Sequence, residues 1–177
     1  RPPRSTLFPY TTLFRSPREK TWLESVMISR TYYHNFVTHL LEAAFQREVY
    51  ERVDKKEPLS ALILNNIKLD VLRKFWGEAV EIPDWAGLTW MRQPHYFMGL
   101  YPYTYSAGLT LGTKVATLLE KGTIQASDWI NVLKAGGTKT PLELAKMVGV
   151  DLTTDQALTE VIDEISQIID HIIAEKQ

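Results

Sequence analysis

The sequence predicts an all-α protein. Apolar residues recur at helical spacing in several segments, and capping residues and glycines separate those segments. No segment alternates apolar and polar residues for long enough to make a sheet. The chain has 177 residues, of which 45% are hydrophobic and 23% charged, a composition typical of soluble globular proteins. This length suits one domain, or one large piece of a domain.

Three helices are predicted in the first half of the chain. Residues 17–30 and 31–55 form two consecutive helices, and residues 58–79 form a third. Residues 81–94 contain two prolines and a glycine with little periodicity, so we expect a loop or a short irregular segment there. The second helix is amphipathic, with an apolar stripe made of Phe36, Val37, Leu40, Leu41, Ala44, Phe45 and Val49.

An aromatic stretch, residues 95–108, leads into a helix that ends near Gly122. Ser127 is a candidate N-cap for a further helix over residues 128–134, and Gly136 together with Gly137 should end it.

Two capping boxes follow. Thr140 and Glu143 form the first, with proline at the first helical position, and Gly149 should close the short helix that it opens. Thr153 and Gln156 form the second. The helix after it carries one apolar stripe suited to docking on a helical core: Leu158, Val161, Ile162, Ile165, Ile168, Ile169 and Ile172.

The segment TLFPYTTLFRS, residues 6–16, has neither helical nor strand periodicity. It matches without a mismatch the translation of a sequencing-adapter oligonucleotide. We therefore expect residues 1–16 to be a non-native tail, with the natural chain beginning at or near Pro17. A short natural N-terminal extension is the alternative.

Composition excludes several function classes. The net charge is −1 with no block of like charges, so neither nucleic-acid binding nor a polybasic membrane patch is indicated. The absence of cysteine excludes disulfides and thiolate metal sites and suits a reducing cytoplasm. No apolar run reaches the roughly 18 residues of a membrane-spanning helix.

The histidines give a weak metal signal. His34 and His39 are five residues apart, so on an α-helix they should lie on different faces. His39 and Glu42 share a face at the i, i+3 spacing that helical metal sites use, but two ligands do not make a site. The alternative is a pair on the helix surface, or a pair that contacts the ligands of a site without binding the metal itself. We expect His171 to be solvated.

The segment WMRQPHYFMGLYPYTYSAGLTLG, residues 90–112, surrounds His95 with tyrosines. Tyrosine hydroxyls and an imidazole N–H can donate hydrogen bonds to a developing oxyanion, and flat rings can line a peptide groove. An aromatic core in which buried tyrosines find hydrogen-bond partners is the alternative. Tyr101, Tyr103 and Tyr105 cannot all point the same way on a helix, so at least one should be structural.

Four segments in collinear order carry a family resemblance: TYYHNFVTHLLE at residues 31–42, FWG at 75–77, AGLTWMRQPHYFMGLYPYTYSAGLTLGT at 86–113 and VLKAGGTKTPLELAKMVGVD at 132–151. With them, residues 17–177 resemble the C-terminal part of oligoendopeptidase F, one of the thimet-oligopeptidase-like zinc metallopeptidases. The resemblance implies a mostly helical body that encloses a channel, and a cytoplasmic enzyme that cleaves oligopeptides. Residues 17–177 would then be the C-terminal part of the peptidase catalytic domain.

The resemblance also implies residue roles. By motif position, His95, Tyr103 and Tyr105 would be catalytic and would hydrogen-bond the substrate in the transition state. Substrate-binding positions would be Tyr96, Gly99 and Tyr101.

The sequence departs from the family at the metal site, since H-E-x-x-H occurs nowhere in it. Zinc is therefore expected in the full-length parent, held by upstream residues, with no metal ligand in this chain. We expect this chain alone to be inactive, with an oligopeptide substrate and the missing N-terminal part of the same protein as its partners. The rival interpretation is a non-catalytic helical module for peptide binding or assembly.

Overall fold

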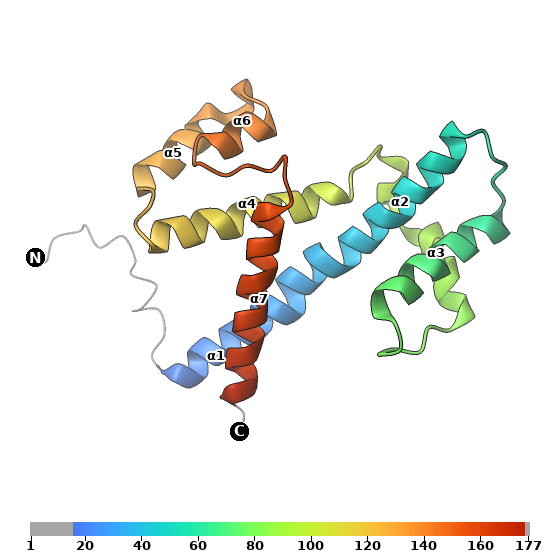
Figure 1. Cartoon of the computed structure of the whole chain (residues 1–177), viewed down its shortest axis with the longest axis horizontal. Coiled ribbons are helices and arrows are strands. Elements are labelled where there is room, and N and C mark those ends of the chain that lie inside the picture. The colour runs from blue at the N-terminus through green and yellow to red at the C-terminus, as the bar shows by residue number, and fades with distance from the viewer. Residues whose placement is uncertain (1–15, 176–177) are drawn as a thin grey trace, which may run out of the picture.

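A computed structural model describes residues 16–175, and within this range every regular element is a helix (Figure 1). The all-α prediction is confirmed. Of the expected non-native tail, residues 1–16, only Ser16 lies within the described residues. The elements are α1 (Pro17–Val26), η2 (Met27–Thr38), α2 (His39–Asp54), α3 (Ala61–Trp76), η3 (Asp84–Arg92), η4 (Pro94–Phe97), α4 (Tyr103–Glu120), α5 (Ala126–Ala135), η5 (Gly136–Thr138), α6 (Pro141–Lys146) and α7 (Gln156–Ala174).

The N-terminal third is one continuous helical rod rather than two consecutive helices. Its central element, η2, is a π-helix in which backbone hydrogen bonds span five residues, as from the His39 N–H to the His34 carbonyl. A sequence stripe at α-helical spacing does not reveal such a turn, because the apolar residues on either side keep the 3.6-residue period. The π-helix changes which side chains in this segment lie next to one another.

The rod is the axis on which the other helices pack (Figure 1). Near its C-terminal end, α3 packs on α2, and η3 packs on α3. Helix α4 contacts η2 and α2, while α7 contacts both α1 and α4. A buried cluster of Tyr32, Phe36 and Val161 joins η2 to α7. His171 is not simply solvated as expected, because its Nδ1 lies 2.7 Å from the Glu24 carboxylate of α1.

A second core lies under α5 and α6, on the C-terminal half of α4. Its buried residues are Val115, Val132, Ala145, Val148, Val150 and Ala157. Figure 1 shows α5 and α6 over this half of α4, at the other end of the molecule from α3. No helix among residues 16–175 combines the length and apolarity needed to cross a membrane.

Two predicted caps are wrong and one is confirmed. Ser127 lies inside α5, because Gln125 and Asp128 form the capping box instead. Thr153 does not cap α7, since its backbone N–H and hydroxyl both donate to the Asp151 carboxylate. The box of Thr140 and Glu143 is present, with its reciprocal hydrogen bonds. Sequence spacing identifies candidate caps, but local side-chain competition decides among them.

The segment predicted to be irregular contains the 3₁₀-helix η3, held close to α3. A Cβ on Gly87 would lie 2.9 Å from the Asn65 carbonyl and 2.9 Å from Leu69 Cγ, so glycine permits this approach. The Trp90 indole N–H donates to Asn65 Oδ1 at 2.8 Å. These contacts fix the start of the segment that carries His95.

Candidate functional site

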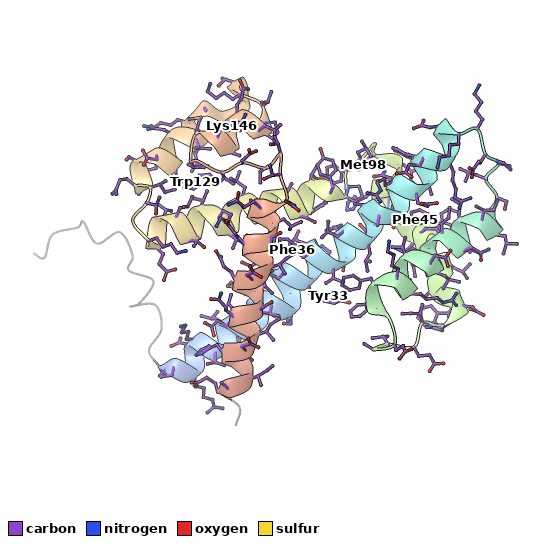
Figure 2. The ribbon with its side chains drawn as sticks, viewed as in Figure 1. Tyr33, Phe36, Phe45, Met98, Trp129 and Lys146 are labelled. Carbon is purple, nitrogen blue, oxygen red and sulfur yellow. The ribbon has the colours of Figure 1, made fainter. Side chains whose placement is uncertain are left out.

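Residues from three elements converge where α2, η4 and the first turns of α4 meet. His39 and Glu42 come from α2, His95 from η4 and Tyr105 from α4. Figure 2 labels Phe45 and Met98, which mark this junction between α2 and the segment after η4. The Gln46 amide of α2 donates to the Met98 carbonyl at 3.5 Å, which ties the two together.

The π-helix brings His34 and His39 together, so the expectation that they lie on different faces is wrong. Their Nε2 atoms are 3.1 Å apart and their ring centroids 4.4 Å apart. A π-helix aligns residues i and i+5, which an α-helix does not. The α-helical spacing argument failed because it assumed a regular α-helix.

Glu42 is the buried centre of the site. His39 and Glu42 are only 1% and 6% exposed, so they are not a surface pair. Glu42 Oε2 lies 2.7 Å from His39 Nδ1, and its Oε1 accepts a hydrogen bond from the Gln93 amide. A buried carboxylate needs such partners because burial without them costs several kcal/mol. Glu42 therefore joins α2 to the segment that carries His95.

His95 is positioned by the short helix η4, which starts at Pro94. Its Nδ1 is buried without a hydrogen-bond partner and lies 3.9 Å from Glu42 Oε2. Its Nε2 is 3.4 Å from the Tyr105 hydroxyl. Leu100, with a φ of 53°, lies in the turn that reverses the chain into α4. This turn returns Tyr105 to His95.

Tyr105 and Tyr101 complete the aromatic cluster. The Tyr105 ring stacks on His39 with centroids 3.8 Å apart, and it meets the Tyr101 ring edge-on at 5.4 Å. A hydrogen bond with Tyr101, followed by burial and the negative charges of Tyr101 and Glu42, raises the pKa of Tyr105. Its hydroxyl therefore keeps its proton and can act as a donor.

The other predicted site residues are more scattered. Tyr103 is 52% exposed. Tyr96 packs its ring on Phe45 at 4.8 Å. A Cβ added to Gly99 would lie 3.9 Å from the Tyr50 hydroxyl. Their predicted roles stay predictions.

Sequence reasoning missed a second polar group next to the cluster. Lys68 of α3 is buried and donates to the Tyr96 hydroxyl at 3.2 Å. Burial lowers the pKa of Lys68, while the nearby Glu42 carboxylate raises it. Burial also raises the pKa of Tyr96. The signal in the sequence is a lysine directly between two apolar residues, Ile67 and Leu69.

A cleft of about 740 Å³ lies beside these groups. Its polar lining comes mainly from Glu42, Lys68, Arg92 and Gln93. Its apolar lining includes Tyr33, Val37, Leu41, Leu72, Trp76, Val80, Ile82 and Trp85. A mainly apolar wall with a few polar groups is typical of ligand sites.

Among the described residues, one group has ligand atoms close enough together for a metal ion. It consists of His39, Glu42 and His95, whose ligand atoms all lie within 4.8 Å of one another. Two ligands of a tetrahedral zinc ion at about 2.0–2.1 Å are separated by roughly 3.3 Å. The 2.7 Å between His39 Nδ1 and Glu42 Oε2 is a hydrogen-bond distance instead. As they lie, the three groups fit a hydrogen-bond network better than a zinc site.

The chain is similar to Oligopeptidase PepF of Bacillus subtilis (strain 168), with 27% identity over 135 residues that cover 72% of this chain and 20% of that protein. An Oligoendopeptidase F homolog of Borreliella burgdorferi is 26% identical over 129 residues, which are 72% of this chain and 22% of that protein. This chain is a homologue of oligoendopeptidase F.

The fold agrees with this relationship. The crystal structure of oligoendopeptidase-F from Enterococcus faecium matches 93% of this chain with a TM-score of 0.85 and 21% sequence identity, over 32% of that structure. No family model matches the sequence. The chain spans about a fifth of the length of the curated relatives, which is consistent with a C-terminal fragment of an oligoendopeptidase F.

Proposed function

We propose that residues 17–177 are the substrate-binding C-terminal part of a zinc-dependent, cytoplasmic oligoendopeptidase that hydrolyses peptide bonds in oligopeptides. The observation that carries this proposal is the convergence of His95 and Tyr105 from two elements, with the Tyr105 hydroxyl 3.4 Å from His95 Nε2. Its further support is the similarity to proteins named oligoendopeptidase F.

In this role the cluster supplies hydrogen bonds to the scissile peptide group. Tyr105, whose raised pKa keeps its hydroxyl protonated, donates to the carbonyl oxygen as negative charge develops there. A hydrogen bond with Tyr101 helps to raise the pKa of Tyr105 and so favours its protonated hydroxyl. Tyr103 is exposed, so a bound peptide could meet its hydroxyl from the solvent side.

Zinc bound by the upstream part of the parent would act as a Lewis acid and activate the attacking water. The missing N-terminal part of the protein is therefore the partner on which activity depends. With no H-E-x-x-H motif, the 177-residue chain alone should be inactive.

Two assays on the 177-residue chain test the proposal. With a quenched fluorescent oligopeptide we expect no hydrolysis, and cleavage that a chelator abolishes would contradict the inactivity. In a titration with the same peptide, we expect the side-chain NMR signals of His95 and Tyr105 to shift. A peptide that binds elsewhere and leaves both signals unmoved would contradict the assigned site.

Matched tyrosine variants separate the roles. Tyr105→Phe should weaken peptide binding roughly 2- to 12-fold, the effect of losing one net hydrogen bond of about 0.5–1.5 kcal/mol. Tyr103→Phe removes the same atom at the exposed position, and its effect measures whether the predicted role of Tyr103 holds. Peptide binding that neither variant affects would favour the non-catalytic module.

A further inference from the structure

Glu42 faces two imidazole rings with one carboxylate oxygen. Its Oε2 lies 2.7 Å from His39 Nδ1 and 3.9 Å from His95 Nδ1. The other oxygen accepts from Gln93. Since an ionised carboxylate only accepts hydrogen bonds, each facing nitrogen is favoured by carrying a proton.

For His39 this fixes the tautomer. A proton on Nδ1 makes the 2.7 Å contact a hydrogen bond to Glu42. Neutral His39 then has an acceptor at Nε2, which lies 3.1 Å from His34 Nε2. His34 completes the chain by donating its own Nε2–H, so every contact in this part of the network has one donor and one acceptor.

The same reasoning applies to His95. Its Nδ1 is buried and has no hydrogen-bond partner at its present distance from Glu42. An unprotonated Nδ1 would point its lone pair at a negative charge in a buried site, where electrostatic effects are weakly screened. A proton there faces the carboxylate favourably, and such contacts often shorten when substrate binds.

We propose that Glu42 is a positioning residue that holds neutral His95 in its Nδ1–H tautomer. This leaves His95 Nε2 as an acceptor, 3.4 Å from the Tyr105 hydroxyl. In the free chain the hydroxyl proton of Tyr105 faces Nε2 or the Tyr101 hydroxyl. When a peptide binds, that proton turns to the carbonyl oxygen and Nε2 accepts a peptide N–H instead.

This assignment rests on the proposed function, and it gives Tyr105 and His95 different roles in binding the peptide. Tyr105 is the donor to the carbonyl oxygen, and His95 is the acceptor for an N–H on the same backbone. A peptide backbone offers both groups, so the pair would select an extended peptide by its main chain.

The test uses the ¹⁵N-labelled 177-residue chain with a chelator present. Two-bond ¹H–¹⁵N spectra distinguish protonated from unprotonated ring nitrogens, and a His95→Asn variant assigns the His95 signals among the four histidines. At a pH where the ring is neutral, we expect a protonated Nδ1 and an unprotonated Nε2 for His95. The reverse pattern, measured in the wild-type chain without any variant, would overturn the proposal.

Two variants make the cause specific. Glu42→Gln, whose amide can donate to Nδ1, should lose the Nδ1–H pattern of His95. Glu24→Gln is the control, because Glu24 also faces a histidine Nδ1, that of His171 at 2.7 Å, but belongs to α1 and not to α2. It should change His171 and leave His95 as in the wild type. If Glu42→Gln does not fold, Glu42→Asp, which keeps the carboxylate, should retain the wild-type tautomer.

A zinc titration tests the competing use of these residues. Stoichiometric binding that shifts the Nδ1 signals of His39 and His95, and that Glu42→Gln abolishes, would overturn positioning in favour of a metal site. The tautomer does not depend on peptide binding. An Nδ1–H His95 in a chain that binds no peptide would therefore refute the proposed function while retaining the assignment to Glu42.

Discussion

Among the individual residues of the candidate site, burial separates the polar groups at its centre from those at its surface. Glu42 and His39 are almost fully buried, whereas Tyr103 is half exposed. The sequence identified the shared face of His39 and Glu42 but not their burial, because an i, i+3 pair looks the same on a core face and on a surface face. Gln93 and Lys68 were missed because their partners, Glu42 and Tyr96, are distant in sequence.

Tyr105 provides the residue-scale prediction on catalysis. In a longer protein that contains both this chain and a metal-binding helix, Tyr105→Phe should lower kcat more than it raises KM, because its hydroxyl acts mainly on the transition state. A loss of one such donor is typically about 10²- to 10³-fold in kcat. Steady-state kinetics on an oligopeptide measure this. A change confined to KM would reassign Tyr105 to substrate binding.

At the scale of elements, the π-helix η2 and the 3₁₀-helix η3 shape the site, and neither follows from periodicity. The apolar stripe correctly predicted that residues 31–55 are helical. It could not predict that the backbone hydrogen bonds of η2 join residues five positions apart. The glycine in residues 81–94 was interpreted as a sign of irregularity, although Gly87 permits close packing of η3 on α3. Such close approaches depend on the partner helix, which local sequence does not specify.

Gly87→Ala should destabilise the chain because its Cβ would clash with backbone and side-chain atoms of α3. We expect a loss of about 1–3 kcal/mol in the free energy of unfolding, the usual cost of overpacking. Gly112→Ala is the matched control: it lies inside α4 with nothing near its Cβ, so alanine should stabilise by roughly 0.5–1 kcal/mol. Urea denaturation compares the two, and equal effects would contradict the close approach of η3.

The capping box of α6 should make stability depend on pH. Hydrogen bonds from the Thr140 backbone and hydroxyl lower the pKa of Glu143 in the folded chain. A lowered carboxyl pKa contributes stability above the pKa of the unfolded state, and this contribution disappears as pH falls through the folded pKa. Acid titrations of unfolding should therefore show a shallower slope in Glu143→Gln. An identical slope would show that the box is not formed in solution.

At the scale of the whole molecule, two cores on α4 hold the rod, α7 and the α5–α6 pair together (Figure 1). The prediction that the apolar stripe of the last helix docks on a helical core is confirmed in part, because Val161 and Ile172 of that stripe are buried. Ile162 and Ile169, which were placed on the same stripe, are substantially exposed. A seven-residue stripe is wider than the contact that α4 and α1 offer.

Val161→Ala should lower the free energy of unfolding by roughly 2 kcal/mol, because it removes two methyl-sized groups from a fully buried position. Ile162→Ala is the adjacent control; its side chain is 47% exposed, so the loss should be smaller. Thermal unfolding by circular dichroism compares them. A larger effect at Ile162 would contradict the packing of α7.

We propose that this chain is the substrate-binding part of a zinc oligopeptidase whose metal-binding helix is encoded upstream. The most direct measurement is to read the genomic DNA on the 5′ side of the Pro17 codon, from a primer within the coding region of residues 90–112. We expect an in-frame H-E-x-x-H upstream and no TLFPYTTLFRS. A start codon followed by the tail as printed would contradict it, and the non-catalytic helical module would then be the better description.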